Sequence, residues 1–166
     1  RKESNLFFAN FKKLNIKKFH LVMEAVGREA NVEKLNVKAA KIKLSKNSSI
    51  IVDDYFQTSN KNIYAIGDVI DRIQLTPVAI AEAMTLVQNL KMKKKEKFNY
   101  NNIPTAVFSN PNFASVGYTE AEAKKKFKNI EVYRSNFRPL KLSLSDVKEK
   151  IFLKLITNKL NDKVVG

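Results

Sequence analysis

The chain has 166 residues, enough for one ordinary hydrophobic core, and its lack of cysteine excludes dithiol chemistry from these residues. Its formal net charge of +15 suggests a nucleic-acid partner, but 26 of the 31 basic residues are lysines rather than arginines, and no aromatic residues are interleaved with the lysine clusters. We therefore expect no nucleic acid as the main partner. We also expect no membrane partner, since no apolar run reaches the roughly 18–20 residues that a membrane span needs.

The amino-terminal half begins with two apolar runs typical of strands, residues 5–11 and 19–26, which a polar, lysine-rich hairpin separates. A short polar helix is expected around residues 32–35. Residues 49–53 predict a further strand. The apolar run at residues 63–66 predicts another, of the kind that is buried in a parallel sheet.

Gly67 and Asp68 follow the last of these runs, where the strand would end. In open α/β sheets ligands bind outside the carboxyl ends of the strands, so Asp68 is a candidate ligand-binding carboxylate. No lysine or arginine follows it until Arg72, which favours a polyhydroxyl ligand over an ion pair. An ordinary βα unit with a solvated aspartate would explain the same pattern.

A helix is expected to begin shortly after this aspartate. Thr76 is a good N-cap and Pro77 a good first helical residue, which together predict a helix over residues 77–95. The first turn of a helix exposes free N–H groups and favours nearby negative charge. Asp68 and the start of this helix are therefore expected to approach one ligand.

The carboxyl-terminal part predicts a β-α-β-β order of elements. The expected strands lie at residues 105–109, 130–136 and 150–158, with a short strand at 116–118. The expected helix covers residues 119–127 and has a threonine cap and two acids in its first turn.

Three blocks of sequence resemble motifs of the pyridine nucleotide-disulfide oxidoreductases, in order and spacing over nearly the whole chain. Residues 63–68 and the Leu-Thr-Pro-Val-Ala-Ile of residues 75–80 resemble the second FAD-binding motif, in the form typical of the glutathione, trypanothione and thioredoxin reductase branch. Residues 25–31 resemble the family's Ala-x-Gly-Arg-x-Pro-Asn, with Ala30 where proline is usual. Residues 102–120 resemble the entry to the family's dimerisation domain.

The resemblance implies an α/β fold in three pieces. Residues 1–30 would end an NAD(P)-binding domain, residues 31–102 would form the carboxyl-side part of an FAD-binding domain, and residues 103–166 would begin an α+β dimerisation domain. It also implies a homodimer and a cytoplasmic setting. The family's redox-active cysteine pair and acid/base histidine would lie in other parts of the protein, so we expect this segment alone to be inactive.

The same resemblance implies an enzyme that uses NADPH and FAD to reduce a disulfide. Asp68 would accept hydrogen bonds from the ribityl hydroxyls of FAD, and the backbone N–H of Thr76 would face the pyrimidine edge of the flavin. Gly27, Gln74 and Ala106 would lie beside the nicotinamide half of NADPH. No metal ligands are expected.

The expected substrate is glutathione disulfide, with one departure from the family pattern. Many glutathione reductases carry on this helix an arginine that binds a substrate carboxylate, and Met84 stands at that position here. Arg138, in a Phe-Arg-Pro-Leu loop, is the candidate substitute. The alternatives are a trypanothione-like or other disulfide reductase, or a non-catalytic remnant that binds flavin or nucleic acid.

Overall fold

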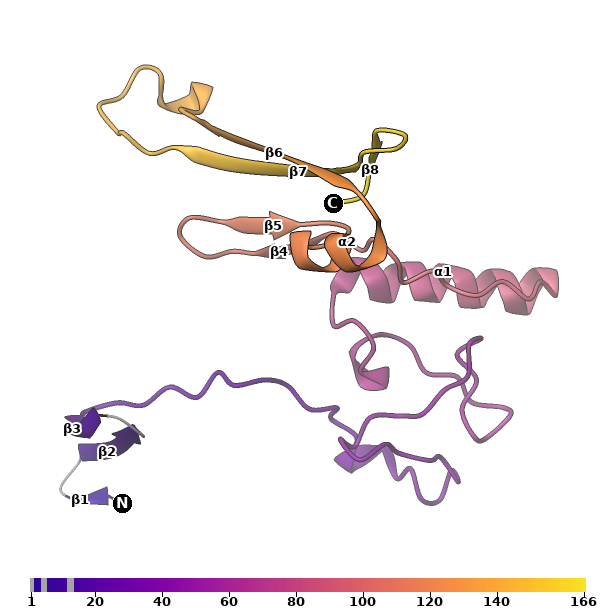
Figure 1. The fold of residues 1–166 in the computed structure, drawn as a ribbon. Helices are drawn as coiled ribbons and strands as arrows, with labels where there is room; N and C mark the ends of the chain where they lie inside the picture. Colours follow the sequence, from indigo (N-terminus) through magenta and orange to yellow (C-terminus); the bar gives the residue numbers. More distant parts are fainter. Residues whose placement is uncertain (1, 4–5, 12–13) are drawn as a thin grey trace. The chain divides into compact units, whose positions relative to one another are not determined.

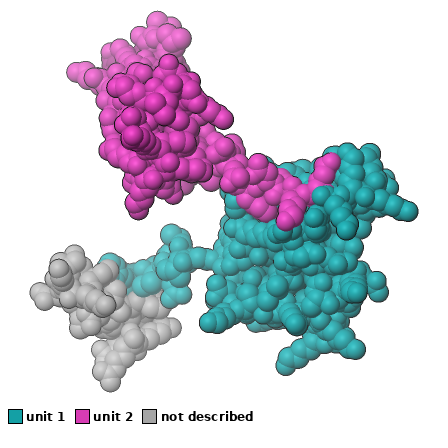
Figure 2. Space-filling model, turned by 45° about the vertical axis from the view of Figure 1, so that its right-hand side comes forward, with its two compact units in different colours: residues 1–95 teal, residues 96–166 magenta. Residues whose placement is uncertain are grey.

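The computed structural model describes residues 2–3, 6–11 and 14–166 (Figure 1). The chain forms two compact units, one up to Lys95 and one over Glu96–Gly166, which Figure 2 colours separately. Helices and strands occur in both, as expected for the α/β class. The expected division after residues 30 and 102 stays a prediction.

The first unit begins with a three-stranded antiparallel sheet in the order β1-β2-β3. Its strands are β1 (Lys2–Glu3), β2 (Leu6–Phe11) and β3 (Leu14–Phe19). The strand expected at residues 5–11 is confirmed over β2, while residue 5 and residues 12–13 of the expected hairpin lie outside the described part of the chain.

The strand expected at residues 19–26 is wrong. The strand forms earlier in the chain instead, because Leu14–Phe19, from the segment expected as the hairpin, pair with β2 as β3. Residues 21–26 have no ladder partner among the described residues, and their apolar side chains stay open to solvent, with Met23 86% and Val26 96% exposed.

The middle of the first unit contains two short 3₁₀-helices and no regular sheet. The 3₁₀-helix η1 (Glu33–Leu35) confirms the expected polar helix. The strands expected at residues 49–53 and 63–66 do not form; isolated antiparallel bridges join Leu44 to Ile50, Val52 to Thr58 and Gln57 to Tyr64. The segment folds back on itself, so that the Ala65 N–H donates to the carbonyl of Phe56 at 3.0 Å. A buried parallel strand needs a neighbouring strand to pair with, and the described residues offer these segments only isolated antiparallel bridges.

The main helix of the first unit, α1, covers Thr76–Met92. The expected helix is confirmed. Its N-cap is Leu75 rather than Thr76, because Thr76 is already helical. After Met92 the helix is closed by Lys93 as the C-cap, in the left-handed conformation. The buried apolar side chains of this unit come from the middle segment and from the helix: Val32, Ile50, Phe56, Ala65, Ile70 and Val78. Phe56 is fully buried and Val78 is 2% exposed, so these two lie at the centre of the small core.

The second unit contains a two-stranded and a three-stranded antiparallel sheet (Figure 1). Its elements are β4 (Thr105–Val107), β5 (Phe113–Ser115), α2 (Glu120–Lys126), β6 (Ile130–Phe137), η3 (Leu140–Leu142), β7 (Ile151–Asn158) and β8 (Lys163–Val164). Four expected elements are confirmed within a few residues. The short strand expected at residues 116–118 is wrong, because the pairing with β4 falls three residues earlier, and the Tyr118 N–H instead donates to the carbonyl of Val165 at 2.9 Å.

Helix α2 begins with the predicted cap. The Thr119 hydroxyl accepts from the Glu122 N–H at 3.3 Å, and the Glu122 carboxylate accepts from the Thr119 N–H at 2.9 Å, which completes a capping box. The backbone hydrogen bond from Thr119 lowers the pKa of the Glu122 carboxyl below its ordinary value.

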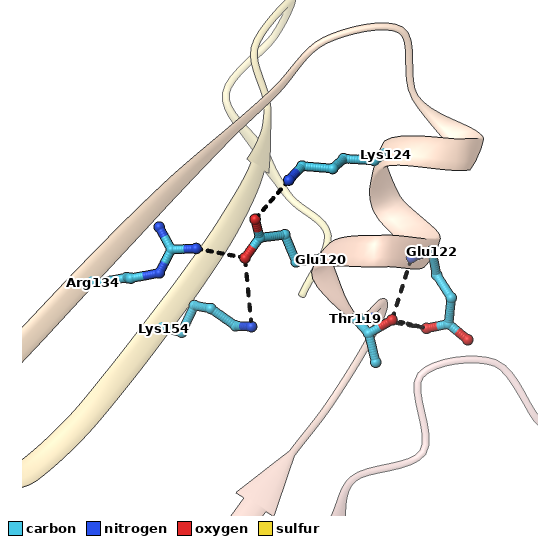
Figure 3. A network of polar contacts seen from close by, with 6 residues as sticks. All are labelled: Thr119, Glu120, Glu122, Lys124, Arg134 and Lys154. Atoms are coloured by element: carbon cyan, nitrogen blue, oxygen red, sulfur yellow. Dashed lines mark hydrogen bonds and ion pairs between the residues drawn. The ribbon is translucent and has the colours of Figure 1, made fainter.

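The Glu120 carboxylate is surrounded by three cations (Figure 3). It lies 2.8 Å from the Lys124 ammonium, 2.6 Å from the Arg134 guanidinium on β6 and 3.8 Å from the Lys154 ammonium on β7. The hydrogen bond from Lys124, with the charges of Arg134 and Lys124 adding to it, lowers the pKa of the Glu120 carboxyl. One acidic side chain therefore joins α2 to two strands of the sheet.

We expect the stability contributed by Glu120 to depend on pH in the acid range. Because folding lowers its pKa from the ordinary value of 4.5, the contribution is fully present above that pH and is lost as the pH falls through the lowered value of the folded protein. Thermal melts of the complete protein between about pH 7 and 3 should therefore show a shallower acid loss for Glu120→Gln than for the wild type. Glu149→Gln, at an exposed carboxylate before β7, is the control and should keep the wild-type slope; an unchanged slope for Glu120→Gln would contradict the assignment.

Candidate cofactor-binding site

The turn at Gly67 and Asp68 lies directly against helix α1. Residues Gly67–Ile70 form the 3₁₀-helix η2, and Gly67 is buried with a φ of +72°. A Cβ atom at Gly67 would lie 3.1 Å from the Cβ of Ala79. Both the backbone conformation and the close approach to the helix therefore require glycine here.

A buried carboxylate holds this turn. Glu82 on α1 is 1% exposed, and its Oε2 accepts a hydrogen bond from the Gly67 N–H at 2.6 Å. The sequence analysis missed Glu82. The signal was a single acid within the otherwise apolar helical stretch Val-Ala-Ile-Ala-Glu-Ala at residues 78–83, because a charge on the inner face of a helix needs a partner.

Asp68 emerges from the turn into solvent. Its side chain is 55% exposed, and its Oδ2 lies 3.7 Å from the Arg28 guanidinium, which is itself 72% exposed. The sequence argument for a polyhydroxyl ligand over an ion pair considered only cations nearby along the chain, and it missed Arg28, so the ligand of Asp68 stays a prediction. An ion pair this exposed contributes only about 0–1 kcal/mol, so it competes weakly with other partners of the carboxylate.

Asp68 and Gln74 share one shallow hollow of about 310 Å³. Its lining residues are Arg28, Glu29, Ala30, Asn31, Asp68, Val69 and Gln74. A second hollow, of about 510 Å³, shares Arg28 and Glu29 with the first and has Gly27 in its wall. Three of the five cofactor-binding candidates thus lie on two adjoining depressions, both bordered by the residues 25–31 motif.

Gln74 and Thr76 flank the approach to α1. The Gln74 amide donates to the Asp71 carboxylate at 2.8 Å, which orients the side chain beside the hollow. Thr76 is exposed at the start of the helix and does not line either hollow. The N–H groups of Val78 and Ala79 both donate to the Leu75 carbonyl at 3.0 Å, so the first turn is well formed.

Ala106 and Arg138 belong to the second unit. Ala106 lies on β4 opposite Ala114 and is exposed. The Arg138 guanidinium donates to the carbonyl of Leu142 at 2.6 Å and to that of Ser145. The residues 138–145 loop is therefore closed by this arginine, an arrangement that the sequence analysis did not anticipate.

Two family models match the chain. The model described as pyridine nucleotide-disulphide oxidoreductase matches residues 4–83, and the model of that family's dimerisation domain matches residues 103–166. The chain belongs to the pyridine nucleotide-disulphide oxidoreductases.

Among individual relatives, the glutathione reductase of Burkholderia cepacia is 43% identical to this chain, and the match covers 87% of this chain. The chain is 40% identical to the chloroplastic/mitochondrial glutathione reductase of Pisum sativum over 89% of the chain, and 40% identical to that of a Nostoc strain over 86%. The chain spans 32%, 27% and 34% of the length of these three relatives, respectively.

A solved structure has the same fold. The HOCl-induced flavoprotein disulfide reductase RclA from Escherichia coli superimposes with a TM-score of 0.87 over 98% of this chain and 38% of the other, at 21% sequence identity. In the part of the chain that the structure describes, no helix is both long and apolar enough to cross a membrane.

The packing at Gly67 generates a stability prediction. Gly67→Ala should lower the free energy of unfolding by about 1–3 kcal/mol, because a Cβ would be strained at positive φ and would press on Ala79. The double substitution Gly67→Ala with Ala79→Gly removes the second Cβ and should recover the steric part of the loss. Denaturant titration of the complete protein measures both, and strictly additive effects would argue against the contact.

Proposed function

We propose that the complete protein is an NADPH-dependent, FAD-containing disulfide reductase that reduces glutathione disulfide. The observation that carries this proposal is the 40–43% identity to proteins named glutathione reductase over 86–89% of the chain. The family models support the same class through its nucleotide-dependent and dimerisation parts. We further propose a homodimer, which sedimentation velocity would test, and a cytoplasmic setting.

The residues around Asp68 fit the ribityl part of FAD. An exposed carboxylate at the edge of a hollow of about 310 Å³ can accept hydrogen bonds from vicinal hydroxyls. Hydrogen bonds to a charged acceptor are roughly twice as strong as neutral ones. The ion pair to Arg28 leaves the Asp68 carboxylate 55% exposed at the edge of this hollow.

The start of α1 fits a partner that carries negative charge. Thr76 and Pro77 open a 17-residue helix whose first-turn N–H groups and dipole favour an anion by about 0.3–1 kcal/mol at the surface. Gly27, Gln74 and Ala106 stay our candidates for the nicotinamide half of NADPH. Gly27 would allow close approach, and the other two would offer polar groups.

The chemistry that bound FAD supplies is two-electron transfer between a pyridine nucleotide and a disulfide. The residues of this chain contribute binding, orientation and electrostatic stabilisation to it. With no cysteine in the sequence, the thiols that exchange with the substrate must come from other residues of the protein.

Substrate choice depends on where the positive charge for glutathione lies. Met84 is 58% exposed on α1 and cannot pair with a carboxylate, so we keep Arg138 as the candidate contact. Its guanidinium already donates to two carbonyls of its own loop. Arg has five N–H donors, so these bonds leave donors for a substrate carboxylate. A reductase of cationic, trypanothione-like disulfides is the second candidate, which the exposed thioether of Met84 favours.

We expect Asp68→Ala to weaken FAD retention in the complete protein. Ribityl hydroxyls that lose their acceptor would cost about 1–3 kcal/mol, or roughly 5–150-fold in the dissociation constant. Asp68→Asn keeps an acceptor without the charge, so its FAD dissociation constant should lie between those of the wild type and Asp68→Ala. Fluorescence titration of the apoprotein with FAD measures all three, and a mutant that holds FAD as tightly as the wild type would remove Asp68 from the site.

Steady-state assays with two disulfides test the substrate. The wild type should reduce glutathione disulfide, and Arg138→Ala should raise its KM about 5–30-fold while leaving the KM for NADPH unchanged, because only the carboxylate contact is lost. Ser145→Ala retains the backbone carbonyl that Arg138 binds and is the control for the loop. A wild type that ignores glutathione disulfide but reduces a cationic disulfide would replace this proposal with the trypanothione-like one.

A further inference from the structure

Glu82 is a charged side chain in an unusual place. It lies on the inner face of α1, 1% exposed, one turn after Val78, which is 2% exposed. Burial of a carboxylate is unfavourable unless hydrogen bonds compensate it, so its position needs an explanation beyond packing. Its Oε2 accepts a hydrogen bond of 2.6 Å from the Gly67 N–H, which joins the helix to the turn.

The bond orients the residue next in sequence. Because Gly67 immediately precedes Asp68, a hydrogen bond that holds the Gly67 N–H constrains the place from which the Asp68 side chain leaves the turn. The turn is held on its other side as well, since the Val69 carbonyl accepts from the Ile50 N–H at 2.9 Å. Asp68 therefore sits between two anchors, one of which is a side chain.

The same side chain links two parts of the proposed cofactor site. Glu82 lies in the second turn of the helix that Thr76 begins, and its carboxylate reaches the turn that presents Asp68. Ala79, between them on the helix, fills the space that a side chain at Gly67 would need. Glu82 thus connects the start of α1 to the turn that carries the Asp68 carboxylate.

We propose that Glu82 is the positioning residue of this site: through the Gly67 N–H it sets the Asp68 carboxylate for hydrogen bonding to the cofactor. This inference rests on the proposed flavin-binding function. Glu82 does not line either hollow, so it acts through Gly67 and Asp68 rather than by touching the ligand.

The chemistry of residue 82 predicts an order among substitutions. A carboxylate gives a charge-assisted hydrogen bond, a glutamine keeps a neutral acceptor of the same reach, and a methionine of similar volume has only a weak acceptor. Glu82→Gln should therefore raise the FAD dissociation constant by less than about threefold. Glu82→Met should raise it about tenfold or more, because the buried Gly67 N–H loses its partner.

The experiment combines two measurements on the complete protein. FAD titration of the apoprotein gives the dissociation constants, and hydrogen exchange of the Gly67 amide reports whether the turn is held. Glu82→Met should lose both tight binding and Gly67 protection, whereas Glu82→Gln should rescue both. The control is Val78→Ala, one turn away on the same buried face, which removes core packing but leaves the hydrogen bond in place. In Val78→Ala, the exchange protection of the Gly67 amide should fall no further than the loss of overall stability explains, and the FAD affinity should equal that of the wild type.

The outcomes separate this inference from the function on which it rests. If Asp68→Ala loses FAD but Glu82→Met keeps it, or if Val78→Ala loses FAD as much as Glu82→Met, Glu82 is merely structural and the inference fails. If the wild type binds no FAD, the proposed function fails. In that case the hydrogen exchange of the Gly67 amide alone tests whether Glu82 holds the turn. Unchanged protection of this amide in Glu82→Met overturns the positioning role.

Discussion

The packing of the candidate site against helix α1 depends on a hydrogen bond between a buried carboxylate and a backbone amide. The Glu82 side chain can accept from the Gly67 N–H only because residue 67 has no side chain, a positive φ and direct contact with Ala79. The two residues therefore act together. Gly67 allows the turn to approach the helix closely, and Glu82 accepts a hydrogen bond from the Gly67 N–H that this approach buries. The core around Phe56 and Val78 packs beside this contact.

The second unit uses a carboxylate in a different way. Glu120 also joins a helix to neighbouring segments, but it does so near the surface, with Lys124, Arg134 and Lys154 as partners. Solvent screens such contacts, so each is weaker than a buried bond, and the cluster gains from several cations around one anion. In a chain with about twice as many basic as acidic residues, each well-placed acid can attract several partners.

The candidate site shows how a binding surface can arise from weakly structured segments. Asp68, Arg28 and Gln74 come from three separate stretches, and none of them lies in a regular strand. Local polar contacts join them: the Arg28 guanidinium pairs with Asp68, and the Gln74 amide donates to Asp71. This explains why short motifs, rather than extended secondary structure, carry the resemblance to the disulfide oxidoreductases, since each motif marks a backbone conformation or a close approach that few residues tolerate.

The sequence by itself determined those elements whose stability is local. Helix α2 could be predicted because Thr119 and Glu122 form their cap within one turn, and β6 and β7 because neighbours in sequence can pair with each other. The motifs likewise identified Asp68 and Gln74, which the structure brings to one hollow. Only the tertiary structure decided the rest. Residues 21–26 and 63–66 have strand-like composition but form no regular strand with any other described segment, because a strand is stabilised by residues distant in sequence. Arg28 beside Asp68 and Glu82 beneath Gly67 are equally non-local contacts, and their residue types alone do not predict them, because a charge acquires its partner only when the chain has folded.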